Sequence, residues 1–139
     1  MAQTLSIAYK DIRRISDIRV REIDDFFGPP GELRVLDAQV LIHPGEFKTV
    51  RTGRSYTAPA GYVISASLRP AFIQKGLAIT HFDATNGLIF ITNHGAIGLF
   101  RELRKSDAIA DIVATKLESI SFTEVPAEPR TTATGGLCA

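Results

Sequence analysis

Short hydrophobic runs recur along the middle of the chain roughly every ten residues, a spacing typical of all-β sandwiches, barrels and jelly rolls. Turn-forming sequences separate most of them: HPGE, RTGRS, APAG, DATNG and NHGAIG. The runs predict strands at residues 33–36, 40–42, 47–50, 62–68, 77–80, 88–92 and 109–115. The fold class expected from this pattern is therefore all-β.

Two of these hydrophobic runs carry more specific patterns. The sequence LIFIT at residues 88–92 is apolar on both faces, so it predicts a fully buried central strand. The sequence DAIADIVATKL at residues 107–117 suits a helix on propensity alone, and its pattern leaves helix and strand open.

The N-terminal region carries the pattern of one short helix. In AYKDIRRIS, residues Tyr9, Ile12 and Ile15 are spaced three apart on one face, with charged residues opposite. A helix this short needs packing to persist. The following DIRVREI alternates in a strand-like way, and Gly28-Pro29-Pro30-Gly31 ends whatever precedes it.

The C-terminal residues 126–139 are rich in proline, threonine and glycine and have little to bury. We therefore predict one β domain over residues 1–125 and a tail that is disordered alone. Ordering this tail would require a protein partner or a neighbour in an assembly.

Composition limits the possible functions. The 139-residue chain is 45% hydrophobic and has a net charge of +1, which suits one soluble domain without non-specific affinity for nucleic acid. No apolar run approaches the roughly 18 residues that span a bilayer. Charges stand where a signal peptide would be apolar, so we expect a protein that is not secreted. The single cysteine, Cys138, excludes an internal disulfide, and no Cys/His spacing predicts a metal site.

The stretch SLRPAFIQKG, residues 67–76, resembles a modified phosphate-binding loop. Arg69, Lys75 and Gly76 stand where such a loop would place a phosphate ligand, a second cation and a closing glycine. Proline follows the arginine in place of a hydroxyl residue, and proline also lacks a backbone N–H.

Five stretches in order resemble the trimeric dUTPases and the dCTP deaminases that share their fold, with the deaminases the more similar. KDIRR (10–14) resembles the deaminases' opening helix, and PPGELRVL (29–36) resembles their proline-led segment. LIHPGEF (41–47) resembles a His-Pro-Gly-Glu turn. APAGYVISASLRPAFIQKG (58–76) occupies the place of a Gly-Arg-Ser-Ser loop, and ELRKSDAIADIV (102–113) resembles Lys-Gly-Asp-x-Ile-x-Gln.

The resemblance implies a distorted β-barrel or jelly roll that assembles as a homotrimer, with nucleotide sites between subunits and Mg²⁺ on a bound triphosphate. It also favours a strand over residues 109–115. If the protein is an enzyme, the candidate catalytic carboxylates are Asp83 and Asp111. Arg69, Lys75 and Gly76 are the candidate nucleotide-binding residues.

The residues that carry the family's chemistry are altered. Pro70 and Ala71 replace two serines after Arg69, Phe90 stands where the deaminases place a glutamate, and Asp111 aligns with a substrate-binding glutamine. Only Asp83 supplies a carboxylate in the shortened segment ITHFDATNG. Each lost hydrogen bond to a charged phosphate is worth roughly 1.5–3 kcal/mol.

Three hypotheses follow. The first is a catalytically degenerate homotrimer that serves as a structural or binding module, for example in a phage capsid, located in the cytoplasm or the virion. The second is a divergent dCTP deaminase or dUTP pyrophosphatase that uses Mg²⁺. The third is a nucleotide-binding sponge or sensor without turnover. On the first hypothesis, Arg69 is a surface or interface arginine, and His81 with Asp83 forms a polar turn.

Overall fold

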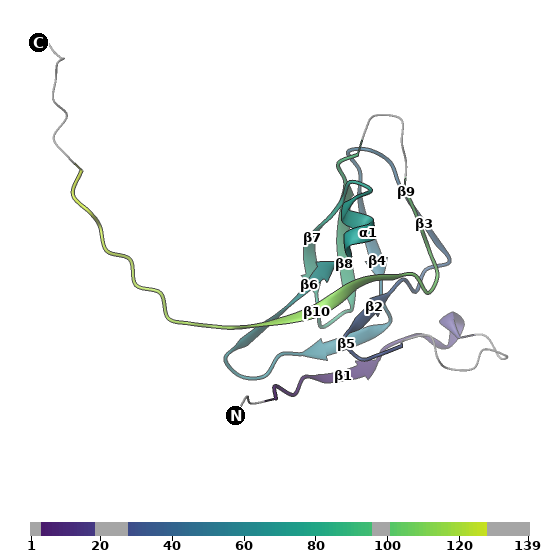
Figure 1. The fold of residues 1–139 in the computed structure, drawn as a ribbon. Coiled ribbons are helices and arrows are strands. Elements are labelled where there is room, and N and C mark those ends of the chain that lie inside the picture. Colours follow the sequence, from purple (N-terminus) through teal and green to yellow (C-terminus); the bar gives the residue numbers. More distant parts are fainter. Residues whose placement is uncertain (1–3, 19–27, 96–100, 128–139) are drawn as a thin grey trace, which may run out of the picture.

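In the computed structural model, nearly all of the regular secondary structure consists of short antiparallel strands (Figure 1). The structure describes residues 4–18, 28–95 and 101–127. The strands within these ranges are β1 Ala8–Asp11, β2 Glu32–Arg34, β3 Gln39–Ile42, β4 Phe47–Arg51, β5 Arg54–Thr57, β6 Tyr62–Leu68, β7 Leu77–Asp83, β8 Leu88–Asn93, β9 Arg101–Arg104 and β10 Ala108–Lys116. The helical elements described are the four-residue α1, Pro70–Ile73, and the 3-10 turn η1, Ile15–Asp17.

The strands form four small sheets that do not close into a barrel. Two sheets have three strands, in the orders β2-β10-β6 and β4-β8-β7, and the other two are the pairs β1-β5 and β3-β9. Strand β6 alternates between inward and outward positions, as expected for a sheet with one buried face. The fold is therefore all-β, as the sequence predicts, with open sheets instead of a closed barrel.

The core lies between these sheets and is formed by aliphatic side chains from most of the strands. Each fully buried side chain of this kind contributes roughly 1.5–3 kcal/mol through removal from water. The largest fully buried aliphatic residues are Leu33, Ile42, Ile89, Ile91, Leu103 and Ile109.

Every predicted run overlaps a strand. LIFIT lies in β8, between β4 and β7, so its predicted central position is confirmed, but Leu88 and Phe90 are only partly buried, so the strand is not fully buried as predicted. DAIADIVATKL supplies β10, so the strand alternative is confirmed. The HPGE turn is also confirmed: the backbone N–H of His43 donates to the Glu46 carboxylate at 2.8 Å, and Gly45 has a φ of +82°.

The predicted N-terminal helix is wrong in this segment. Residues Ala8–Asp11 form β1, which pairs with β5, and the only helical part that the structure describes among residues 4–18 is η1. Tyr9 lies opposite Tyr56, with ring centroids 6.3 Å apart, and the Arg54 guanidinium lies 5.1 Å from the Tyr9 ring centroid. These cross-strand contacts outweigh a weak local helical preference.

Strands β5 and β9 were not predicted, because RSYT and RELR are too polar to stand out. The strand-like residues 19–23 and most of the tail lie outside the described residues. Among the residues that the structure describes, no helix is long and apolar enough to cross a membrane. Beyond β10, residues 117–127 continue as an exposed extended arm that leaves the body of the molecule (Figure 1).

Candidate functional site

The candidate phosphate loop forms one turn of helix between β6 and β7. Arg69 precedes α1 in an extended conformation, and Pro70 occupies the first helical position, where its missing N–H is tolerated. The loop's backbone donors are used internally. The N–H groups of Phe72 and Ile73 donate to the Arg69 carbonyl at 2.9 and 3.2 Å, and those of Gln74, Lys75 and Gly76 donate to carbonyls within the same turn. The loop therefore presents few backbone donors to an anion.

The Arg69 side chain donates three hydrogen bonds to carboxylates of its own chain. Its Nε–H and Nη2–H reach the two Asp111 oxygens at 3.2 and 3.0 Å, and Nη2–H also reaches Glu32 Oε2 at 2.9 Å. The sheet β2-β10-β6 creates this arrangement because Asp111 lies opposite Glu32 on one side and Ser67 on the other. Arg69, two residues beyond Ser67, therefore reaches both carboxylates.

Arg34 completes a four-residue ion-pair network. Its Nε–H donates to the Glu32 Oε1, so two arginines face two carboxylates and their charges cancel. Burial would raise the pKa of Glu32, but the hydrogen bonds from Arg34 and Arg69 outweigh it and hold that pKa below its usual value. The hydrogen bonds to Asp111 and then Glu32 raise the pKa of Arg69. Glu32 was not predicted as a site residue from the sequence, because only the strand register places it beside Asp111.

Asp83 lies away from this network. It ends β7, whereas Gly76 directly precedes β7, so the seven-residue strand places them roughly 20 Å apart along its length. Asp83 accepts hydrogen bonds from the Asn86 backbone N–H at 3.2 Å and from the Asn86 side chain at 2.8 Å. The Asn86 bonds lower the pKa of Asp83. It thus closes the DATNG turn, and the structure does not bring it to Asp111.

Lys75 and Gly76 both have roles within the loop. The Lys75 ammonium lies 5.3 Å from the Phe72 ring centroid, and its carbonyl accepts a hydrogen bond from Arg101. Gly76 has a φ of +86°, and its carbonyl accepts the His94 N–H at 2.6 Å. A Cβ at position 76 would lie 2.8 Å from the backbone of Gly95. Close packing and backbone conformation thus account for the glycine.

Two surface cavities lie elsewhere. A groove of about 450 Å³ separates β6 from β7 and is lined mainly by apolar and hydroxyl side chains, with His81. A cavity of about 290 Å³ beside Ile12 and Leu36 includes Arg51. The Arg51 guanidinium donates to Asp37 at 2.9 Å and to Asp17 at 3.0 Å, so this arginine is also paired within the chain.

Within the described residues, no cluster of side chains could hold a metal ion by itself. None of their His, Cys, Asp and Glu side chains come together in a group of three or more suited to a metal ion. Asp111 and Glu32 are the nearest carboxylates to Arg69, and both are held by arginines.

Comparison with solved structures identifies the fold. The dUTPase of phage phi11 of S. aureus, solved as a mutant with a structural Mg(II) ion, superposes with a TM-score of 0.62 at 16% identity, over 91% of this chain and 100% of that one. The Staphylococcus bacteriophage 80alpha dUTPase gives 0.61 at 17% identity, over 90% and 99%. Its structures were described in work on phage dUTPases that control transfer of virulence genes. No family model and no curated protein matches the chain. The chain therefore has a dUTPase-like fold.

Proposed function

We propose that this protein is a non-catalytic homotrimer with a dUTPase-like fold that acts as a structural or binding module. One observation carries the proposal: the only arginine of the candidate phosphate loop is held by Asp111 and Glu32. The resemblance to trimeric enzymes supports the homotrimer, and the open-edged sheets are compatible with packing between subunits.

The electrostatics oppose a triphosphate at Arg69. To bind phosphate, Arg69 would have to leave Asp111 and Glu32, and those carboxylates would then stand beside the incoming anion. Like charges a few ångströms apart repel, most strongly where water is partly excluded. The two positions after the arginine, where the family loop has serines, offer no compensating hydroxyl, because they are Pro70 and Ala71. The wild-type loop is therefore expected to bind no nucleotide.

The phage origin of the similar structures supports a location in a virion or in the infected cytoplasm, with capsid decoration or scaffolding as the role. The 80alpha protein is described among phage dUTPases that control transfer of virulence genes. We also propose that a protein partner or an assembly neighbour binds the C-terminal tail, residues 126–139, of this chain.

Two measurements test the proposal together. Light scattering of the purified protein should give a mass about three times the 15.1 kDa of one chain. Thermal unfolding with dCTP, dUTP, dUMP and dTTP, with and without Mg²⁺, should show no shift, although a ligand at a hundred times its Kd would add about 2.7 kcal/mol. A monomeric mass, or a shift with any of these nucleotides, would refute it.

The alternative is a divergent dUTP pyrophosphatase or dCTP deaminase, favoured by the match to phage dUTPases over nearly their whole length. It would use Arg69, Lys75 and Gly76 for the nucleotide, and Asp83 or Asp111 with Mg²⁺ for the chemistry. Release of pyrophosphate or ammonia that Arg69→Ala abolishes would establish it. Saturable binding without product would instead establish a nucleotide sponge or sensor.

A further inference from the structure

The turn between β7 and β8 requires a glycine at position 87. Gly87 has a φ of +62°, and a Cβ there would lie 2.5 Å from the Arg54 carbonyl oxygen and 2.9 Å from Thr52 Oγ1. The Gly87 carbonyl accepts hydrogen bonds from the Thr52 N–H at 2.8 Å and from the Thr52 hydroxyl at 2.9 Å. The packing therefore leaves no room for a side chain at this position.

Asn86 stands immediately before this glycine, and its side chain is exposed to water. The carbonyl carbon of an asparagine side chain closes a five-membered ring with the backbone nitrogen of the next residue. The ring closes most readily when that residue is glycine, because no Cβ hinders the approach. The turn thus fixes a reactive pair, an exposed asparagine followed by an obligatory glycine.

The chain has one other asparagine, Asn93, and it lies in a different environment. Asn93 is 1% exposed and precedes a histidine. Its side-chain amide donates to the Ile42 carbonyl at 2.8 Å, and its side-chain oxygen accepts the Gly95 N–H at 2.7 Å. Burial and two hydrogen bonds hold this second carboxamide, so Asn93 is an internal reference for Asn86.

Asp83 restrains the Asn86 carboxamide. The Asn86 side-chain amide donates to one Asp83 oxygen at 2.8 Å, and the Asn86 backbone N–H donates to the other at 3.2 Å. Hydrogen bonds to an ionised group are among the stronger ones in proteins. The carboxamide must turn toward the Gly87 nitrogen before the ring can close, so its bond to Asp83 has to break first. Asp83 is therefore placed to slow the reaction.

We infer that Asn86 is a site of spontaneous deamidation and that Asp83 sets its rate. The Gly87 nitrogen loses its proton and bonds to the Asn86 side-chain carbonyl carbon. The carbon–nitrogen bond of the carboxamide breaks, and the amide nitrogen takes up a proton and leaves as ammonia. Water then opens the cyclic imide at either carbonyl, which gives aspartate or isoaspartate at position 86. The sum is one water consumed and one ammonia released, without metal, nucleotide or partner.

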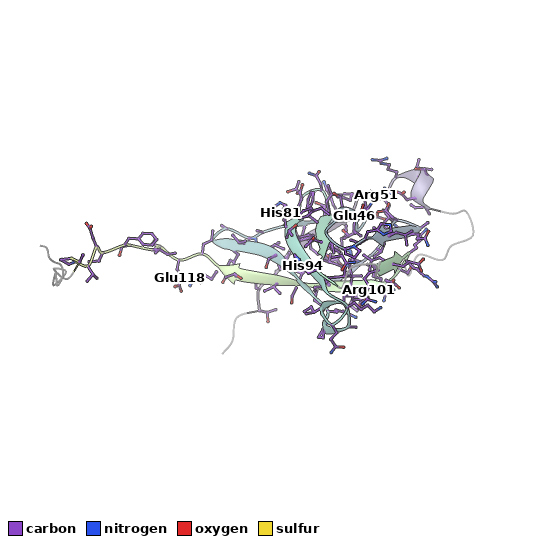
Figure 2. The ribbon with its side chains drawn as sticks, turned by 90° about the horizontal axis from the view of Figure 1, so that it is seen from above. Glu46, Arg51, His81, His94, Arg101 and Glu118 are labelled. Atoms are coloured by element: carbon purple, nitrogen blue, oxygen red, sulfur yellow. The ribbon has the colours of Figure 1, made fainter. Side chains whose placement is uncertain are left out.

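The new carboxylate would loosen the turn. It would lie beside Asp83, where two negative charges repel in place of the former hydrogen bond. Asn86 also lines the cavity of about 290 Å³ that contains Arg14 and Arg51. Arg51 lies beside η1 (Figure 2) and is already paired with Asp17 at 3.0 Å. The direct contact with Asp83 should outweigh these cations, so Asn86→Asp should unfold at a lower temperature than wild type at neutral pH.

Incubation in water enriched in heavy oxygen tests the site. Full-length protein is held at neutral and at mildly alkaline pH, then digested and mapped by mass spectrometry. Heavy oxygen should enter at residue 86 and not at Asn93, and faster at the higher pH, because ring closure needs the deprotonated Gly87 nitrogen. Asn86→Gln is the matched control, since its longer side chain would have to close a larger ring. It should stay unlabelled over the same time.

Asp83→Ser tests the restraint. Serine keeps an acceptor for the Asn86 backbone N–H but releases the side-chain amide. Folded Asp83→Ser should take up label at residue 86 about tenfold faster than folded wild type, the effect of losing one charge-assisted hydrogen bond. In denaturant the two chains should label at the same rate, and folded wild type should label more slowly than unfolded wild type.

Each other result overturns part of the inference. Label that is absent from residue 86, or equal at residues 86 and 93, means that Asn86 is not the site. Equal rates for folded Asp83→Ser and folded wild type mean that Asp83 does not control the reaction. If Asp83→Ser does not fold, wild type alone decides, because folded protein that labels as fast as unfolded protein excludes the restraint. An Asn86→Asp midpoint equal to wild type refutes the loosening of the turn.

Discussion

Gly76 illustrates how a single residue's backbone fixes the loop. Its φ is +86°, a conformation that side chains disfavour, and a Cβ would also lie 2.8 Å from Gly95 Cα and N. Gly76→Ala should therefore lower the free energy of unfolding by more than about 1 kcal/mol. Chemical denaturation of the wild-type protein and of Gly76→Ala measures the difference in the free energy of unfolding.

Gly45→Ala is the matched control for Gly76→Ala. Gly45 has a similar φ of +82°, but nothing lies within 4 Å of its Cβ position. Its substitution should cost only the backbone strain, and so less than Gly76→Ala. Equal losses would show that close packing against Gly95 does not explain the glycine at position 76.

Ser106 has the backbone conformation of a glycine without being one. It is the one described non-glycine residue with a positive φ, +73°, and it stands where the resembling enzymes have glycine in Lys-Gly-Asp. Its N–H still donates to the Val35 carbonyl at 2.8 Å. Ser106→Gly should raise the thermal midpoint, because strain of this kind costs on the order of 1 kcal/mol. An unchanged or lower midpoint would mean that the serine side chain offsets the strain.

At the scale of elements, Glu32 ties β2 to the end of β6 across β10. Its folded pKa lies below its usual 4.5, so its contribution to stability is present above pH 4.5 and is lost as pH falls through the folded pKa. Glu32→Gln should therefore be less stable than wild type at pH 7, by about 1 kcal/mol. The two proteins should converge as the pH falls through the folded pKa of Glu32.

Urea unfolding at a series of pH values checks this dependence. Glu118→Gln serves as the control, since Glu118 is exposed on the arm, and it should follow wild type throughout. A Glu32→Gln deficit that is constant with pH would show that lost packing, and not the ion pairs with Arg34 and Arg69, explains the effect.

Strands with a clear hydrophobic period could be predicted from the sequence, whereas strands that depend on pairing with another strand could not. The LIFIT strand is visible because four apolar residues in a row, followed by threonine, favour a central strand of a sheet. Strands β1, β5 and β9 owe their state to pairing, which depends on residues far away in the sequence. The site followed the same rule: Arg69 and Asp111 were named from a motif, but their pairing and the part of Glu32 follow from the strand register.

At the scale of the whole molecule, the arm is structurally separate from the body. Residues 118–127 contribute nothing to the described core, so a chain ending at Leu117 should keep the fold. If the arm links copies, full-length protein should unfold at higher temperature as its concentration rises, because association stabilises the folded state by mass action. The shortened chain should show little or no such rise.

Calorimetry over about a hundredfold range of concentration measures both effects. At the lowest concentration the full-length and shortened chains should unfold at nearly the same temperature, because without association the arm does not stabilise the body. A shortened chain that is less stable at every concentration would mean that the arm packs on its own body. A full-length midpoint independent of concentration would mean that the arm does not stabilise an assembly. Only the predicted combination, an equal midpoint when dilute and a rise confined to the full-length chain, assigns the arm's exposed Ile120 and Phe122 to contacts between molecules.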